Sequence, residues 1–286
     1  MKRIKIQKQS WQKMAEVWKK YIKPPSRPCV FQIKSWKSII KKEIRDTHHA
    51  RALILGSTPE LRDLSLDLGF HTFVVDINQP MVSAMTSLMK NKDLSKEVRI
   101  IKNWLKMDFP EYYFDLILGD ASLNQVFRKQ DLKNLLAKLS KFLKHKGIML
   151  MREVVHLSKT PVIRRTKDWI LWFNKYKKGV INELDLYSMF KYQSDINSFN
   201  SPSLADVTVL FYKLESADLK SKVPKKFYYF FIKAFGKPPV SKFLVVYLKK
   251  DLEKLFRQYF EITSLKSCPE HYHCQYMLQY LLKPKK

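Results

Sequence analysis

The segment from residue 52 to residue 76 constrains the fold more than any other part of the chain. Ala52–Leu55 is a short, wholly apolar run, typical of a strand that is buried on both faces, and Gly56 ends it. A helix is predicted over residues 59–68 and a second buried strand over residues 72–76. A strand, a tight turn, a helix and another strand in this order form a βαβ unit, which requires a parallel sheet with a right-handed crossover.

The residues of the turn suit a ligand with an anionic group and hydroxyl groups. Ser57 and Glu60 fit a capping box and Pro59 suits the first helical turn, so backbone N–H groups at the helix start are expected to face the ligand. Asp76, at the carboxyl end of the second strand, suits ribose hydroxyls. A dinucleotide site would need three glycines after the first strand, and only Gly56 is present, which disfavours NAD or FAD.

The alternation of strands and helices continues downstream. We predict helices over residues 80–90 and 130–143 and strands over residues 98–102, 115–119 and 148–154. This pattern predicts an α/β fold with a mostly parallel sheet, in which ligands bind beyond the carboxyl ends of the strands. Four residues that follow or end predicted strands are therefore expected at one edge: Gly56, Asp76, Asn103 and Asp120.

These motifs together resemble those of the class I S-adenosylmethionine (SAM)-dependent methyltransferases. The turn at residues 55–60, Leu-Gly-Ser-Thr-Pro-Glu, is similar to a first motif that some members carry, and residues 75–77 followed by Met81 are similar to the second. Residues 103–107 and 114–124 resemble the third and fourth motifs. Two positions depart from the family pattern: Ala121 stands where Gly is frequent, and Asn103 where many relatives have Asp.

The resemblance implies SAM as the cofactor, with its ribose on Asp76, its adenine beside Ile77 and its methionyl end near Gly56 and Ser57. The implied cofactor-binding residues are Gly56, Ser57, Thr58, Asp76, Ile77, Met81, Asn103, Trp104, Asp120 and Ala121. It also implies a Rossmann-like sheet, mostly parallel with an antiparallel last strand, together with N-terminal helices and a helical insertion between the fifth and sixth strands.

The chain is expected to divide into four segments. Residues 1–48, with a helix over residues 10–22, would cover the cofactor, and residues 49–155 would form the SAM-binding core. Residues 156–240 are unusually aromatic and are predicted to form a helical cap for the acceptor. The predicted helices include residues 204–214, residues 227–235 form a further apolar segment, and the whole stretch has no convincing strand signal. Residues 241–286 return to the core with a helix near 250–259 and strands at 260–265 and 275–282.

Catalytic and acceptor residues are less well marked. Methyl transfer needs a general base only when the acceptor is protonated, and location alone makes Asp120, Glu153 and His156 candidates. Six residues are second-rank candidates for acceptor contacts: Trp11, Trp18, Arg27, Asn124, Trp169 and Trp172. The plain alternative for each aromatic residue is packing within the core.

Two further features bear on ligands. Four possible zinc ligands lie within residues 268–274, but so compact a set can hardly surround one ion tetrahedrally, so we predict a loop and no metal. The three cysteines do not form a disulfide framework, which favours a reduced, cytoplasmic compartment. No apolar run approaches the length of a membrane span.

Composition leaves the acceptor open. The net charge of +28 implies nonspecific attraction to polyanions such as nucleic acids at low salt, although the lysines are scattered rather than clustered. Three functions therefore compete: a SAM-dependent methyltransferase with a small-molecule acceptor, an RNA or polyanion methyltransferase, and a catalytically inactive SAM-fold binding subunit. The oligomeric state also stays open.

Overall fold

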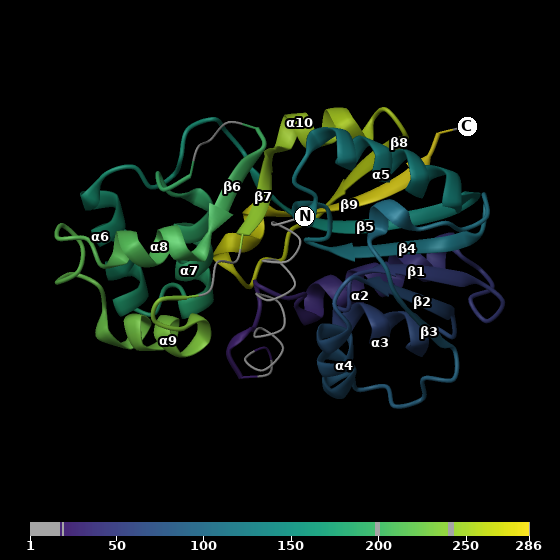
Figure 1. Ribbon diagram of the computed structural model, residues 1–286, viewed down its shortest axis with the longest axis horizontal. Helices are drawn as coiled ribbons and strands as arrows, with labels where there is room; N and C mark the ends of the chain where they lie inside the picture. Colours follow the sequence, from purple (N-terminus) through teal and green to yellow (C-terminus); the bar gives the residue numbers. More distant parts are fainter. Residues whose placement is uncertain (1–17, 19, 198–200, 240–242, 286) are drawn as a thin grey trace.

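The computed structural model describes residues 18, 20–197, 201–239 and 243–285. Figure 1 shows two lobes: a twisted sheet with helices on both sides, and a cluster of helices labelled α6 to α9. Strands β6 and β7 lie between the lobes, at the end of β5. The chain therefore builds a Rossmann-like core and then leaves it after β5 to form the helical lobe.

The main sheet has the strand order β3-β2-β1-β4-β5-β9-β8. Its parallel strands are β3 (Glu97–Ile101), β2 (His71–Asp76), β1 (Arg51–Leu55), β4 (Phe114–Asp120) and β5 (Leu143–His156). The final strand β9 (Met277–Pro284) runs antiparallel to both β5 and β8 (Phe260–Leu265). The predicted fold class, a mostly parallel sheet with an antiparallel last strand, is confirmed.

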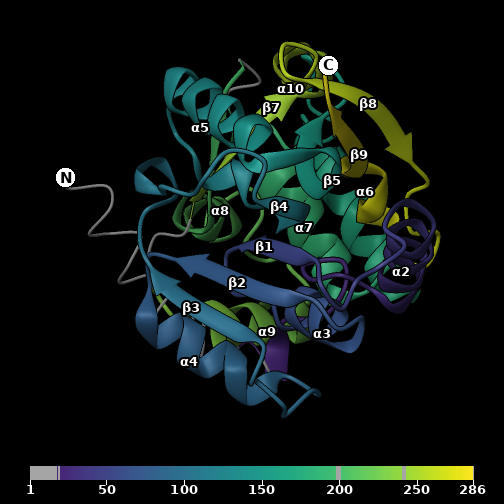
Figure 2. The ribbon, with the colours of Figure 1, turned by 90° about the vertical axis from the view of Figure 1, so that its right-hand side faces the viewer.

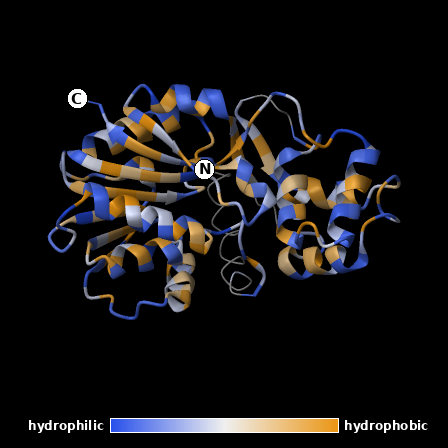
Figure 3. Ribbon diagram, turned by 180° about the vertical axis from the view of Figure 1, so that it is seen from behind, coloured by the Kyte–Doolittle hydropathy of each residue, from blue (hydrophilic) through white to orange (hydrophobic). Residues whose placement is uncertain are grey.

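Helices cover both faces of this sheet (Figure 2). Helices α2 (Val30–Glu43) and α3 (Pro59–Asp67) pack on one face, and α5 (Lys129–Phe142) and α10 (Lys249–Phe256) pack on the other. Successive residues of β1 alternate between the two layers: Ile54 packs with α2 and α3, whereas Leu53 and Leu55 pack with α5 and α10. Because both faces are covered, the middle residues of the central strands are mostly apolar, and Figure 3 shows much orange along the sheet.

The helical lobe contains α6 (Thr166–Lys177), α7 (Glu183–Gln193), α8 (Val207–Leu214) and α9 (Lys225–Phe235). These helices share one apolar core, which also takes in Met81 and Met85 of α4 (Gln79–Leu88) and Trp18 and Ile22 of the N-terminal segment. The lobe therefore packs directly against the part of the core that follows β2. The division of the chain into four functional segments stays a prediction.

The helix predicted over residues 204–214 is wrong in its first turn. Residues Ser203–Asp206 form strand β6, which pairs antiparallel with β7 (Phe243–Leu248), and α8 begins only at Val207. The Asp206 side chain accepts a hydrogen bond from the Thr208 N–H at 2.9 Å and so caps α8. The β6–β7 pair continues from the end of β5, since Val155 and His156 of β5 pair in parallel with β7. Neither short strand was predicted, because each is stabilised by pairing rather than by a local pattern.

Among the residues that the structure describes, no helix has the length and apolar character needed to cross a membrane.

Candidate functional site

A cavity of about 460 Å³ lies at the carboxyl ends of β1, β2 and β4 and is closed by residues of the helical lobe. Its volume is in the range of small-molecule sites. All ten predicted cofactor-binding residues lie in its wall: Gly56, Ser57, Thr58, Asp76, Ile77, Met81, Asn103, Trp104, Asp120 and Ala121. Four motifs that are separate in the sequence thus meet around one space.

The turn between β1 and α3 depends on Gly56. Its φ of 100° lies in the left-handed region that favours glycine, and its N–H donates to the Val75 carbonyl at 2.9 Å. The predicted capping box is wrong: the N-cap residue is Thr58, without a side-chain cap, and the Glu60 carboxylate instead pairs with Arg27. The α3 start is therefore joined to the N-terminal segment.

Asp76 presents a carboxylate at the end of β2. Its Oδ1 accepts the Asn78 N–H at 2.9 Å, and the Ser57 hydroxyl also hydrogen bonds to it. Burial raises the pKa of Asp76 above its usual value, although these hydrogen bonds oppose the rise. The carboxylate is thus fixed in the cavity wall, between the β2 end and the Gly56 turn.

The segment after β3 forms another part of the wall. The Trp104 indole Nε1 donates to the Val75 carbonyl at 2.6 Å, and a Cβ placed on Gly56 would lie 3.8 Å from the Trp104 ring. The Asn103 side chain accepts the Leu105 N–H at 2.9 Å and so begins the short helix η1 (Trp104–Lys106). Trp104 is therefore held beside the glycine turn by its own hydrogen bond.

A buried ion pair closes the end of β4. The Arg152 guanidinium lies 2.6 Å from the Asp120 carboxylate, and the two side chains are 1% and 5% exposed. Arg152 also donates to the carbonyls of Pro25 and Arg27 and to the Gln32 side chain, at 3.1 to 3.2 Å. Asp120 thus orients an arginine that anchors the N-terminal segment, instead of presenting a free carboxylate to the cavity.

The residue after this acid adopts an unusual backbone conformation. Ala121 has a φ of 49°, and its N–H donates to the Arg152 carbonyl at 2.6 Å. The Ser122 hydroxyl donates to the Leu55 carbonyl at 2.7 Å and accepts the Asp120 N–H at 3.1 Å. A left-handed backbone at this position explains why glycine is frequent there in the family whose motifs this sequence resembles.

Two of the three proposed catalytic candidates lie outside the cavity wall. Both Glu153 carboxyl oxygens accept backbone N–H groups, from Leu123 and Asn124, at 3.2 Å, and burial raises the pKa of Glu153 to about 8. The His156 ring lies 2.8 Å from the Ser203 hydroxyl, and burial lowers the pKa of His156 to about 4. Their location in the sequence suggested catalysis, but their contacts are those of structural groups.

The acceptor candidates divide in the same way. Trp18 lies in the cavity wall, whereas Trp11 lies outside the described residues. Trp169 stacks on Phe190, with ring centroids 4.3 Å apart, inside the helical lobe, and Trp172 packs edge-on against Tyr272. These two tryptophans pack against neighbouring aromatic rings, which was the alternative to acceptor contacts.

The two polar candidates also hold the structure together. Arg27 pairs with Glu60, as described above, and neither lies in the cavity wall. Asn124 joins β5 to β7, because its amide donates to the Val154 and Val245 carbonyls and its oxygen accepts the Val154 N–H at 2.8 Å. Their polar groups are already occupied by protein partners.

The sequence predicted an aromatic cap for the acceptor over residues 156–240 but did not single out Ser188, Lys191 and Tyr192 of α7. Tyr187, Ser188, Lys191 and Tyr192 of this helix lie in the wall. A usable signal was present: a serine and a lysine, three residues apart, interrupt the run of apolar and aromatic residues from 186 to 192. Lys191 is only 3% exposed, and its ammonium lies 5.1 Å from the Tyr192 ring centroid and 5.8 Å from that of Tyr187.

Burial of Lys191 predicts a measurable effect on stability. Burial lowers its pKa from 10.5 to about 8, an effect that the attraction of Asp206 only partly opposes. Stability is therefore lost as the pH falls from 10.5 to about 8, and a change of this size corresponds to about 3 kcal/mol. We expect Lys191→Met to raise the free energy of unfolding in urea at pH 7 by up to about 3 kcal/mol, with a gain that shrinks as the pH approaches 10.5.

The exposed Lys178, at the end of α6, provides the matched control, and Lys178→Met should leave stability unchanged at both pH values. A loss of stability at pH 7 in Lys191→Met would contradict the prediction, because it would mean that the ammonium is well solvated or paired.

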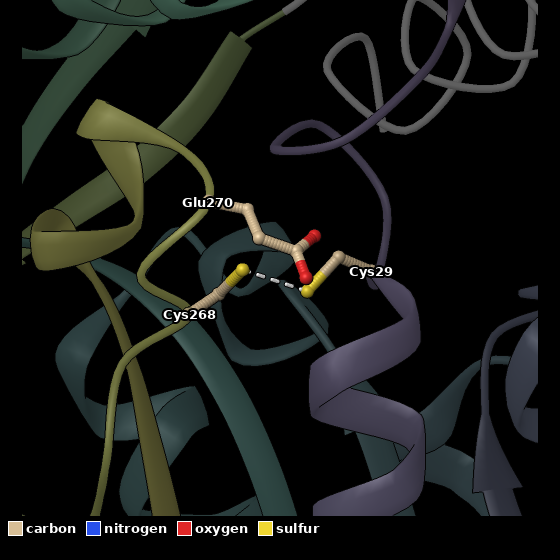
Figure 4. A group of neighbouring side chains, drawn as sticks. All are labelled: Cys29, Cys268 and Glu270. Carbon is tan, nitrogen blue, oxygen red and sulfur yellow. Dashed lines mark hydrogen bonds between the residues drawn. The ribbon is translucent and has the colours of Figure 1, made fainter.

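A cluster of three buried thiols lies apart from the cavity. The Sγ atoms of Cys29, at the start of α2, and Cys268, after β8, are 2.8 Å apart, and Glu270 lies beside them (Figure 4). Cys274 completes the cluster, whereas the His271 ring lies toward Asp185. Burial raises the pKa of Cys29 to about 11, so this thiol stays protonated at neutral pH. The cluster joins the N-terminal helix to the C-terminal loop, and we assign no metal to it.

Comparison with known proteins agrees with this arrangement. Residues 55–151 match a family model described as a methyltransferase domain, while a search of curated proteins gives no match. The fold is similar to that of the CcbJ methyltransferase from Streptomyces caelestis, with a TM-score of 0.56, 9% identity and coverage of 97% of this chain and 98% of that chain.

Two further solved structures share the fold. The 1,6-didemethyltoxoflavin-N1-methyltransferase from Burkholderia thailandensis, crystallised with its named substrate and S-adenosylhomocysteine (SAH), gives a TM-score of 0.52 at 11% identity, covering 100% of this chain and 90% of that chain. An S-adenosylmethionine-dependent methyltransferase from Clostridium acetobutylicum gives a TM-score of 0.51 at 15% identity, with coverage of 96% of this chain and 99% of that chain.

Proposed function

We propose that this protein binds SAM in the cavity and transfers its methyl group to a small-molecule acceptor. The proposal is supported by the match of residues 55–151 to a methyltransferase-domain model and by a fold similar to those of solved methyltransferases. One observation carries the proposal: the glycine turn after β1, the acid at the end of β2, the tryptophan after β3 and the end of β4 all line the same space. Packing alone gives no reason for these four features to converge.

The wall of the cavity fits the cofactor chemically. Asp76 would accept hydrogen bonds from the ribose hydroxyls, and Ile77 and Trp104 would flank the adenine. Gly56, with its left-handed backbone, and the neighbouring Ser57 would lie against the methionyl end of SAM. When bound, SAM supplies a methyl group already activated by its sulfonium.

The contribution of the chain to the reaction is then positioning and exclusion of water. Asp120 is paired with Arg152, both Glu153 oxygens accept backbone N–H groups, and His156 is buried outside the cavity wall. None of these three groups is available as a general base. We therefore propose that the acceptor presents a nucleophile that needs no deprotonation by them.

The character of the remaining wall favours a small acceptor. Trp18, Met85, Tyr187, Phe235 and Met277 give the cavity an apolar and aromatic lining. Such a lining suits an apolar or planar molecule better than the backbone of a nucleic acid, which requires exposed cations. The Burkholderia methyltransferase named above, which shares only the fold, was crystallised with the small molecule 1,6-didemethyltoxoflavin bound.

Calorimetry with SAM, SAH and NAD tests the cofactor assignment directly. We expect both SAM and SAH to bind with a stoichiometry near one, and NAD not to compete. A screen of metabolite pools with methyl-labelled SAM would then detect transfer. Failure of the folded protein to bind SAH would reject the proposal, whereas binding without transfer to any pool would favour a non-catalytic binding subunit.

A further inference from the structure

Helix α7 contributes one polar face to an otherwise apolar part of the cavity. Tyr187, Ser188, Lys191 and Tyr192 are spaced so that they share one side of the helix, and they are 5%, 1%, 3% and 8% exposed. The Tyr187 ring is held in place by stacking on Phe235 of α9, with centroids 4.5 Å apart. This face is therefore preformed and forms part of the cavity wall.

Among the described residues, the Lys191 ammonium has ring contacts but no oxygen partner, and Asp206 acts on it only by longer-range attraction. The rings of Tyr187 and Tyr192 offer only partial compensation for the loss of water. A buried ammonium normally has an anionic partner, because burying an isolated charge is costly.

The position of α7 separates Lys191 from the expected cofactor site. Gln193 fixes the helix to the end of β5, since its side chain donates to the Val155 carbonyl at 3.1 Å. The ribose and methionyl groups are expected at the ends of β2 and β1, and β4 lies between β1 and β5 in the sheet. The anionic partner of Lys191 is therefore expected on the ligand that occupies the β5 side of the cavity.

On the premise that the proposed methyl transfer is correct, we infer that the acceptor is a small apolar molecule that carries a carboxylate, which binds the Lys191 ammonium between the rings of Tyr187 and Tyr192. A carboxylate matches the single cation on this face, with the neighbouring Ser188 hydroxyl as a further donor. A phosphate dianion would place a second charge against an apolar wall. The proposal adds a substrate class to the proposed reaction, and assigns α7 the role of its recognition element.

Matched pairs of acids and amides test this assignment on the protein saturated with SAH. The probes are benzoate and benzamide, phenylacetate and phenylacetamide, and indole-3-acetate and indole-3-acetamide, measured by calorimetry or ligand-observed NMR. We expect at least one acid to bind about 10-fold or more tightly than its amide, the size of effect expected for a charged hydrogen bond. Lys191→Met should abolish that preference, Lys191→Arg should retain part of it, and Lys178→Met should leave it unchanged.

The affinity for SAH separates failure of this inference from failure of the proposed function. If the wild-type protein does not bind SAH, the proposed function fails first. If SAH binds but no acid binds more tightly than its amide, or if Lys191→Met keeps the preference, the carboxylate assignment is wrong. If Lys191→Met weakens SAH itself by about 10-fold or more, the lysine belongs to the cofactor site, and the inference is likewise overturned.

Discussion

Replacing Asp76 by alanine is expected to weaken the binding of SAH by about 30-fold or more, as measured by calorimetry. The carboxylate stands in the cavity wall and is already oriented by the Asn78 N–H at 2.9 Å and by the Ser57 hydroxyl. Ribose hydroxyls would donate to a charged and partly desolvated acceptor, and such hydrogen bonds contribute about 1.5–3 kcal/mol each. Alanine removes these hydrogen bonds and leaves the ribose hydroxyls without their protein partner.

The matched control is Asp67→Ala, which removes an exposed carboxylate at the end of α3, outside the cavity wall. Its SAH affinity should equal that of the wild-type protein. Asp76→Asn should fall between the two, because the amide keeps one acceptor but loses the charge. Unchanged affinity in Asp76→Ala, with the variant still folded by circular dichroism, would show that the ribose lies elsewhere.

The sequence predicted the core well because its signals are local. Residues 52–55 of β1 are an apolar run that must be covered on both faces, and the turn that follows needs a left-handed backbone that Gly56 adopts without strain. Parallel strands then bring their carboxyl ends to one edge without further information. This is why residues from four separate motifs could be predicted to meet, and why they do line one cavity.

The predictions that were wrong concern residues whose polar groups bind a partner far away in the sequence. Glu60 fits a capping box by spacing, but Arg27, which is 33 residues away, takes its carboxylate. Glu153 and His156 were placed near the site by sequence order but are held by backbone amides and by Ser203, outside the cavity wall. Asp120 does line the cavity, but its carboxylate is taken by Arg152. Lys191 was missed for the same reason, since only packing of the helical lobe brings α7 to the cavity. Long-range contacts decide such roles; a local pattern such as the serine and lysine of α7 marks the residues as unusual but does not show where they lie.

Asp120→Ala should destabilise the fold by about 3–5 kcal/mol, because it leaves a buried arginine without its counter-ion. Arg152 is 1% exposed, and its remaining partners are two carbonyls and one amide oxygen, which do not balance its charge. For a chain of this size, the midpoint of thermal unfolding should fall by about 6–20 °C. Glu111→Ala is the control, since it breaks the exposed pair with Lys141 and should cost no more than about 1 kcal/mol.

The double variant Asp120→Ala/Arg152→Met separates the two consequences of this pair. It removes both charges, so it should recover much of the stability lost in Asp120→Ala, as is found when buried ion pairs are replaced by apolar residues. It cannot restore the hydrogen bonds from Arg152 to the Pro25 and Arg27 carbonyls, which hold the N-terminal segment over the cavity. We therefore expect SAH affinity to stay reduced even where stability returns. If the double variant were no more stable than Asp120→Ala, the unpaired charge would not be the cause of the loss, and the role assigned to Asp120 would have to be abandoned.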